Sequence, residues 1–124
     1  MAGRTMKAHF LPIACLLLPI ACGSEDDATA SKATALEAPQ LTQVVPMTGA
    51  LHLTWTNHQH DCESTDAERK TDTENYAAVF SVPGSVDNKM DGTATDTTKT
   101  YTYRLRCKKA ADYSPYSNEM SGKP

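Results

Sequence analysis

The chain has few of the residues that build a large apolar core or a basic surface. Only 6% of its 124 residues are aromatic, and it contains one tryptophan. Arg4 and Lys7 are the only charged residues among the first 21, so residues 22–124 carry 10 Lys and Arg against 15 Asp and Glu, a formal charge of −5. This acidic balance argues against nucleic acid as a partner, because nucleic-acid-binding domains usually show a clustered basic surplus. After residue 21 no apolar run approaches the roughly 20 residues that a membrane-spanning helix needs.

The sequence also lacks the short motifs that mark common active sites. It has no nucleophile-elbow serine, no His-Glu-x-x-His pair, no phosphate-binding glycine loop and no Cys-x-x-Cys. Its carboxylates fall in polar segments, without the apolar surroundings that acid–base catalysis requires. We therefore predict neither an enzyme nor a bound cofactor.

Residues 1–21 have the three-part layout of a secretory signal peptide. Met1–His9 is basic, Phe10–Ala21 is apolar but too short to span a membrane, and the small Ala21 precedes Cys22. The letters LPIAC that end at Cys22 resemble the lipobox of bacterial lipoproteins, in which the cysteine is lipidated and becomes the first mature residue. The same letters end at Cys15, but the apolar run continues beyond it, so we predict cleavage before Cys22. The alternative is an ordinary secreted protein with a cysteine near its cleavage site.

The lipoprotein resemblance implies that acyl chains on Cys22 hold the protein on a membrane of the bacterial cell envelope. We expect the outer membrane or the cell surface rather than the inner membrane. Residues 22–38 are rich in Ala, Ser, Thr and acidic residues, without apolar periodicity. Such a segment cannot bury enough surface to offset the entropy lost on ordering, so we predict a flexible tether.

Residues 39–124 have the pattern of short β-strands separated by turns. In Leu51–Trp55, and again in Tyr101–Cys107, apolar residues alternate with polar ones, as in strands with one buried face. A third apolar run, Tyr76–Val82, ends at the turn-forming pair Pro83-Gly84. These strands predict an antiparallel β-sandwich. Its predicted core contains Trp55, Tyr101, Tyr103 and Leu105.

Several segments resemble a fibronectin type III domain, in the order in which that family has them. They are Pro39–Leu41, Gly49–Trp55, Val82–Gly84, Thr98–Arg106 and Tyr116–Glu119. Trp55 matches the family's core tryptophan, and Tyr101 matches the corner tyrosine whose hydroxyl bonds the backbone a few residues upstream. The resemblance implies an all-β, seven-stranded antiparallel sandwich over residues 39–124 and a non-catalytic role as a spacer, adhesion or partner-binding module. The fold alone does not choose between these roles.

Two cysteines remain once Cys15 has been cleaved away and Cys22 acylated. Export places Cys62 and Cys107 in an oxidising compartment, which favours a disulfide between them. In the family's topology, Cys62 begins the third strand and Cys107 ends its antiparallel neighbour. If Ala67 faces inward, strand alternation turns Cys62 outward, so we expect a bulge or a loop to redirect its side chain.

His58 and His60 stand at alternate positions just before Cys62. Imidazoles with this spacing are weak candidates for binding Zn²⁺ or Cu²⁺. Two histidines are an incomplete ligand set, and a disulfide uses Cys62. We therefore predict no metal site and interpret the segment as a solvent-exposed loop.

Basic and aromatic residues gather near the end of the chain. The segment Lys108–Tyr116 is predicted to form the loop between the last two strands. Its candidate binding residues are Lys108, Lys109, Tyr113 and Tyr116, because exposed aromatic side chains beside basic ones are typical of binding surfaces. In the alternative, Tyr113 or Tyr116 folds back to cap the end of the sandwich.

Charged residues also alternate along the two strands that should be neighbours. Arg104, Arg106 and Lys108 lie on one strand, and Asp66 and Glu68 lie on the other. We favour cross-strand ion pairs on an exposed face over a patch that binds anionic ligands.

These observations together predict a membrane-anchored lipoprotein that presents one fibronectin type III-like binding or spacer module at the cell envelope. Its partner is expected to be a protein or a polysaccharide. Two alternatives are a small periplasmic metal-binding lipoprotein that uses His58 and His60, and an accessory subunit of an envelope enzyme complex.

Overall fold

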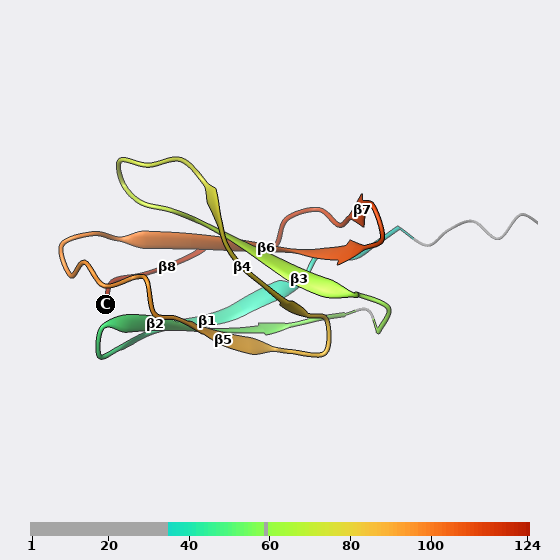
Figure 1. The fold of residues 1–124 in the computed structure, drawn as a ribbon, viewed down its shortest axis with the longest axis horizontal. Coiled ribbons are helices and arrows are strands. Elements are labelled where there is room, and N and C mark those ends of the chain that lie inside the picture. The colour runs from blue at the N-terminus through green and yellow to red at the C-terminus, as the bar shows by residue number, and fades with distance from the viewer. Residues whose placement is uncertain (1–34, 59) are drawn as a thin grey trace, which may run out of the picture. The chain divides into compact units, whose positions relative to one another are not determined.

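In the computed structural model, residues 35–58 and 60–124 are described. They belong to one compact unit, Ala33–Pro124, and contain two antiparallel β-sheets that lie face to face, and no helix (Figure 1). The three-stranded sheet has the order β1-β2-β5, and the five-stranded sheet has the order β4-β3-β6-β7, with β8 also pairing with β6. The prediction of an all-β antiparallel sandwich is confirmed.

The strand bounds are β1 (Gln40–Met47), β2 (Ala50–Thr56), β3 (Ser64–Lys70), β4 (Ala77–Pro83), β5 (Asn88–Asp91), β6 (Tyr101–Lys109), β7 (Asp112–Tyr113) and β8 (Met120–Gly122).

The predicted signal peptide, Cys22 and the tether as far as residue 34 lie outside the described residues. Residues 35–39 precede the first strand and have no regular secondary structure. In the part of the chain that the structure describes, no helix has the length and apolar character needed to cross a membrane.

The core lies between the two sheets and is built mainly by β2 and β6. Leu51, Leu53 and Trp55 of β2 are at most 2% exposed, and the polar residues between them point away from the core. Trp55 stacks on Phe80 of β4, with ring centroids 6.2 Å apart. The residues that β6 contributes to the core are Tyr101, Tyr103, Leu105 and Cys107.

The described residues form eight strands instead of the predicted seven, because the last strand is split in two. β7 and β8 pair with opposite ends of β6. Pro115, which has no N–H to donate, lies in the irregular stretch between them. Across this stretch the hydroxyl groups of Ser114 and Ser117 accept hydrogen bonds from the backbone N–H groups of Cys107 and Leu105, both at 2.8 Å. The two serine side chains thus satisfy buried backbone donors that a continuous strand would satisfy with its carbonyls.

Tyr101, the first residue of β6, fixes the corner that leads into this strand. Its hydroxyl accepts a hydrogen bond from the backbone N–H of Asp96, at 3.2 Å, and the residue is 4% exposed. The contact reaches five residues upstream, as the family resemblance implies for a corner tyrosine.

Candidate functional site

Three connections gather at one end of the sandwich: the β2–β3 loop, the β4–β5 loop and the β6–β7 turn (Figure 1). Cys62 in the first loop and Cys107 in β6 form a disulfide, with their Cα atoms 5.6 Å apart. β3 begins only at Ser64, so Cys62 lies in the loop and not in the strand. The loop turns its side chain inward, to 8% exposure, which resolves the conflict that strand alternation raised.

Backbone contacts hold these loops close together. The N–H of Glu63 donates to the carbonyl of Lys108, and the N–H of Gly84 donates to the carbonyl of Glu63, both at 2.9 Å. A Cβ on residue 84 would lie 1.7 Å from the carbonyl oxygen of Cys62. Only glycine fits at this position, so the turn-forming pair Pro83-Gly84 also sets the spacing between two loops.

The β6–β7 turn is tied to the β2–β3 loop by charged groups. Lys109 donates to the carboxylate of Asp61 at 2.6 Å, and the backbone N–H of Ala110 donates to Glu63 at 2.9 Å. The hydrogen bond between Lys109 and Asp61 lowers the pKa of Asp61 and raises the pKa of Lys109. Lys109, a predicted binding residue, is therefore engaged by its own chain.

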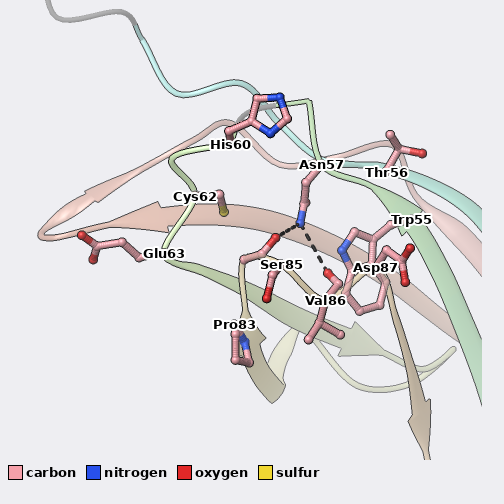
Figure 2. A pocket seen from close by; sticks show the side chains of 11 residues that line it. Trp55, Thr56, Asn57, His60, Cys62, Glu63, Pro83, Ser85, Val86 and Asp87 are labelled. Carbon is pink, nitrogen blue, oxygen red and sulfur yellow. Dashed lines mark hydrogen bonds between the residues drawn. The ribbon is translucent and has the colours of Figure 1, made fainter.

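An open pocket of about 580 Å³ lies among these loops (Figure 2). Its polar lining includes Asn57, His60, Glu63, Ser85 and Asp87. The Asn57 amide donates to the carbonyl of Gly84 at 2.7 Å and so joins the β2–β3 and β4–β5 loops. The indole N–H of Trp55 is buried beside the pocket and has no hydrogen-bond partner among the described residues. The polar groups of the pocket already serve the loops, because Glu63 accepts from Ala110, Asp87 accepts from Asn88, and the Asn57 amide donates to Gly84.

The histidines of this end do not assemble a metal site. His58 and His60 are both exposed, and the sulfur of Cys62 is held in the disulfide. Within residues 35–58 and 60–124, no three His, Cys, Asp or Glu side chains group closely enough to hold a metal ion.

The predicted loop Lys108–Tyr116 is for the most part a tight hairpin, which corrects that part of the prediction. β6 continues to Lys109 and β7 occupies Asp112–Tyr113, so the turn contains only Ala110 and Ala111. Ala110 makes this turn with a φ of 52°, in the left-handed region. The hairpin places Tyr113 on the outer face of the five-stranded sheet, and neither Tyr113 nor Tyr116 caps the end of the sandwich, because both rings lie against arginines of β6.

On this outer face, aromatic rings and guanidinium groups alternate. We call Tyr76, Arg104, Tyr116, Arg106 and Tyr113 the tyrosine–arginine stack. The Cζ of Arg104 lies 3.8 Å from the ring centroid of Tyr76 and 3.7 Å from that of Tyr116. The Cζ of Arg106 lies 3.8 Å from the centroid of Tyr113 and 5.1 Å from that of Tyr116. Each guanidinium therefore lies between two rings, which limits its rotation and adds cation–π attraction.

The predicted cross-strand ion pairs form at one position and not at the next. Glu68 lies opposite Arg104 and binds it at 2.6 Å, and it also accepts a hydrogen bond from the hydroxyl of Tyr116. Asp66 lies opposite Arg106, yet it accepts its hydrogen bonds from Ser81, at 2.6 Å, and from Ser64, at 3.4 Å. Arg106 has no ion pair within the described part of the chain, and its Nε is buried without a hydrogen-bond partner.

Sequence reasoning missed one member of the stack. Tyr76 begins an apolar run and was expected to be part of a strand, but β4 starts one residue later, at Ala77. Its ring packs on Arg104, and its hydroxyl donates to Glu119. Burial and this hydrogen bond both raise the pKa of Tyr76. The only signal in the sequence was an aromatic residue next to a polar loop.

The sequence also gave no sign of a buried charged network around Asp91, which is 3% exposed. One carboxylate oxygen accepts from Arg69 at 2.6 Å and from the hydroxyl of Tyr103 at 2.8 Å. The other accepts from the backbone N–H and the hydroxyl of Thr93, at 3.0 and 2.6 Å. Burial alone favours the neutral acid, but these hydrogen bonds outweigh it and lower the pKa of Asp91.

Comparison with known proteins adds information on the fold only. No protein-family model and no curated protein matches the sequence. Several solved structures do match. One is a fibronectin type III-like protein from Clostridium thermocellum, which is 22% identical with a TM-score of 0.57, over 71% of this chain and 92% of the other. Domains A168–A170 of titin are 15% identical with a TM-score of 0.57, over 72% of this chain and 32% of theirs.

A pectate lyase from Pectobacterium carotovorum also matches, at 18% identity and a TM-score of 0.59. The match covers 71% of this chain and only 27% of the lyase, so it concerns a small part of that enzyme. At such identities these likenesses show the fold alone. Within the described residues, the strands between Gln40 and Gly122 form a fibronectin type III-like β-sandwich.

Proposed function

We propose that this chain is a lipid-anchored protein of the bacterial cell envelope that presents one fibronectin type III-like module as a non-catalytic binding domain. The tyrosine–arginine stack is the observation that carries the proposal. Tyrosine and arginine are the residue types that are enriched at binding surfaces and at their energetic centres. In this chain they form one continuous row on the outer face of the five-stranded sheet.

The anchoring half of the proposal rests on the signal-like segment that ends at Cys22. Because an acyl-anchored protein stays with membranes, Cys22→Ala should move the protein to the soluble fraction or leave it unprocessed. Cys15→Ala is the matched control and should change little, since that residue is removed with the signal. Membrane fractionation and mass spectrometry of the mature N-terminus measure both outcomes. An unmodified mature chain that begins beyond Cys22 would overturn the anchor.

A pull-down from membranes with two tagged proteins, wild type and Tyr113→Ala, tests whether the module binds a partner or acts only as a spacer. In wild type, the module should co-purify with an envelope protein or polysaccharide. In Tyr113→Ala, which removes the most exposed ring of the stack, that material should be lost. Equal recovery with both proteins would mean that the stack does not bind this material, and no recovery with wild type would favour a spacer. Surface protease treatment of cells shows which side of the envelope the module faces.

An accessory role beside an envelope enzyme is a second candidate. It is supported by the pectate lyase match, in which the matching part makes up 27% of a longer chain. Consistent recovery of one hydrolase in the same pull-down would favour it. The metal-binding alternative gains no support from His58 and His60, which are exposed and lack further ligands among the described residues.

A further inference from the structure

The tyrosine–arginine stack contains two arginines in closely similar settings, of which only one has a carboxylate. Arg104 is bound by Glu68 through its Nε and Nη2 atoms, at 2.8 and 2.6 Å. Arg106 lies two residues further along β6 and faces the same way, yet no carboxylate in the described part of the chain pairs with it. Glu68 on Arg104 therefore shows that a guanidinium held between tyrosine rings can bind a carboxylate. We expect the same kind of group to bind Arg106.

The side chain of Arg106 is preorganised to bind a carboxylate. Its Cζ lies 3.8 Å from the ring centroid of Tyr113, and its Nε is buried and unpartnered. A guanidinium fixed between rings loses little conformational entropy when it binds a carboxylate, and its N–H groups match the two carboxylate oxygens. Lys108, the next outward residue of β6, adds a second positive charge beside it.

A hollow of about 400 Å³ opens beside Arg106 and Lys108, over the small residues Ala78 and Ser81 of β4. Asp66 lies in its wall. Both hydrogen bonds that Asp66 accepts go to the same oxygen, Oδ1, which leaves Oδ2 without a donor among the described residues. In this hollow Arg106 and Lys108 can bind a carboxylate, and Asp66 can accept a hydrogen bond from a hydroxyl group.

We propose that this hollow, at Arg106, Lys108 and Asp66, binds a uronate unit of an acidic polysaccharide. This inference rests on the proposed function, because it names the ligand of the same face. A uronate ring carries both a carboxylate and hydroxyl donors, and so it satisfies Arg106 and Asp66 together. An acidic peptide has carboxylates but few hydroxyl donors, so it would leave the free oxygen of Asp66 without a hydrogen bond.

The test is calorimetric titration of the full chain, purified in a neutral detergent, with a galacturonate hexamer. The hexamer should bind, and its methyl ester, which keeps the ring and loses the charge, should bind at least about tenfold more weakly. Arg106→Gln should raise the dissociation constant of the hexamer by about tenfold or more. Lys108→Gln is a second variant at the rim of the hollow, and it should raise the constant by a smaller factor.

Lys109→Gln is the matched control, because it removes the same charge from the neighbouring residue, whose partner is Asp61. It should change the dissociation constant by less than about twofold. Equal binding of the methyl ester, or a failure of the hexamer to bind, would overturn the proposal. Equally tight binding of polyglutamate with the same number of carboxylates would assign the site to an acidic peptide. If any of these outcomes is found while membrane retention still depends on Cys22, the proposed ligand is wrong but the lipid-anchored module remains supported.

Discussion

Asp91→Asn tests how the two sheets are held together. Asp91 ends β5 of the three-stranded sheet, whereas Arg69 and Tyr103, which donate to its Oδ2, belong to β3 and β6 of the other sheet. Asparagine keeps the shape of the side chain but loses its charge. If its carbonyl replaces Oδ1, its amide N–H₂ faces two other donors. If its carbonyl replaces Oδ2, the amide N–H₂ faces the donors of Thr93 instead. In either orientation the substitution breaks an ion pair and removes the acceptor of at least one donor.

The size of the effect follows from these contacts. Removing one partner of a buried ion pair costs about 3–5 kcal/mol. The side chain of Arg69 is 22% exposed and recovers some hydration, which places the expected loss of unfolding free energy near the lower end, at about 3 kcal/mol. A domain of this size is stable by only about 5–15 kcal/mol, so this loss is a large fraction of the total.

The assay is urea unfolding at pH 7 of a fragment of residues 33–124, the compact unit, followed by the fluorescence of the buried Trp55. Asp87→Asn is the control, because Asp87 is exposed and, among the described residues, its carboxylate accepts one hydrogen bond, from the neighbouring Asn88. The control should unfold within about 0.5 kcal/mol of wild type. If Asp91→Asn also unfolds within that margin, the network does not join the sheets and the reasoning fails.

The pH dependence provides an independent check on the same network. Burial raises the pKa of Asp91, but hydrogen bonds from Thr93, Tyr103 and Arg69 lower it further, so the folded value lies below the unfolded one. Between the two values the unfolded chain binds more protons. The stabilisation is therefore complete above about pH 4 and is lost as the pH falls through the folded pKa. The stabilities of wild type and Asp91→Asn should converge as the pH falls below about 4, and a constant difference would show that the charge of Asp91 is not the cause.

Three further changes test the core and its links in the same assay. Trp55→Ala removes the ring that stacks on Phe80 and should cost about 3–5 kcal/mol; an unchanged midpoint would contradict its core position. Tyr101→Phe keeps the ring and loses only the hydrogen bond from Asp96, so the expected cost is about 1–2 kcal/mol, and a larger loss would mean that the ring moves. Reduction of the Cys62–Cys107 disulfide, whose residues are 45 apart, should cost up to about 4 kcal/mol by the loop-entropy argument; no loss on reduction would refute that argument.

The parts of the structure that sequence predicts well are those set by local alternation. Leu51, Leu53 and Trp55 alternate with polar residues, and the pleat of a strand then places all three on one face. The same holds for Tyr101, Tyr103 and Leu105. Neither segment needs a contact from elsewhere in the chain to define its buried side, and for this reason both core strands could be identified from the sequence.

The Asp91 network could not be predicted, because its partners are distant in sequence and uninformative by type. Asp91-Gly92 has the composition of an exposed turn, and Arg69, 22 residues earlier, lies in a strand with small inward residues. Only the assembly of the two sheets brings Arg69, Tyr103 and Asp91 together. The split last strand was missed for a related reason: the serine hydroxyls that bridge the gap around Pro115 have no characteristic spacing.

The missing ion pair of Arg106, at the proposed binding site, could not be predicted from the sequence for the same reason. Two strands place Asp66 opposite Arg106 and Glu68 opposite Arg104, and from those two strands alone both pairs are expected. The third strand decides the outcome, because β4 places Ser81 beside Asp66 and Ala78 beside Glu68. The hydroxyl of Ser81 donates a hydrogen bond to Asp66 at 2.6 Å. Ala78 has no group that can donate to Glu68, and Glu68 therefore pairs with Arg104. It follows that Ser81→Ala should release Asp66 to pair with Arg106 and weaken uronate binding while the fold is kept. An unchanged affinity in this variant would mean that the hydroxyl of Ser81 does not keep the arginine open.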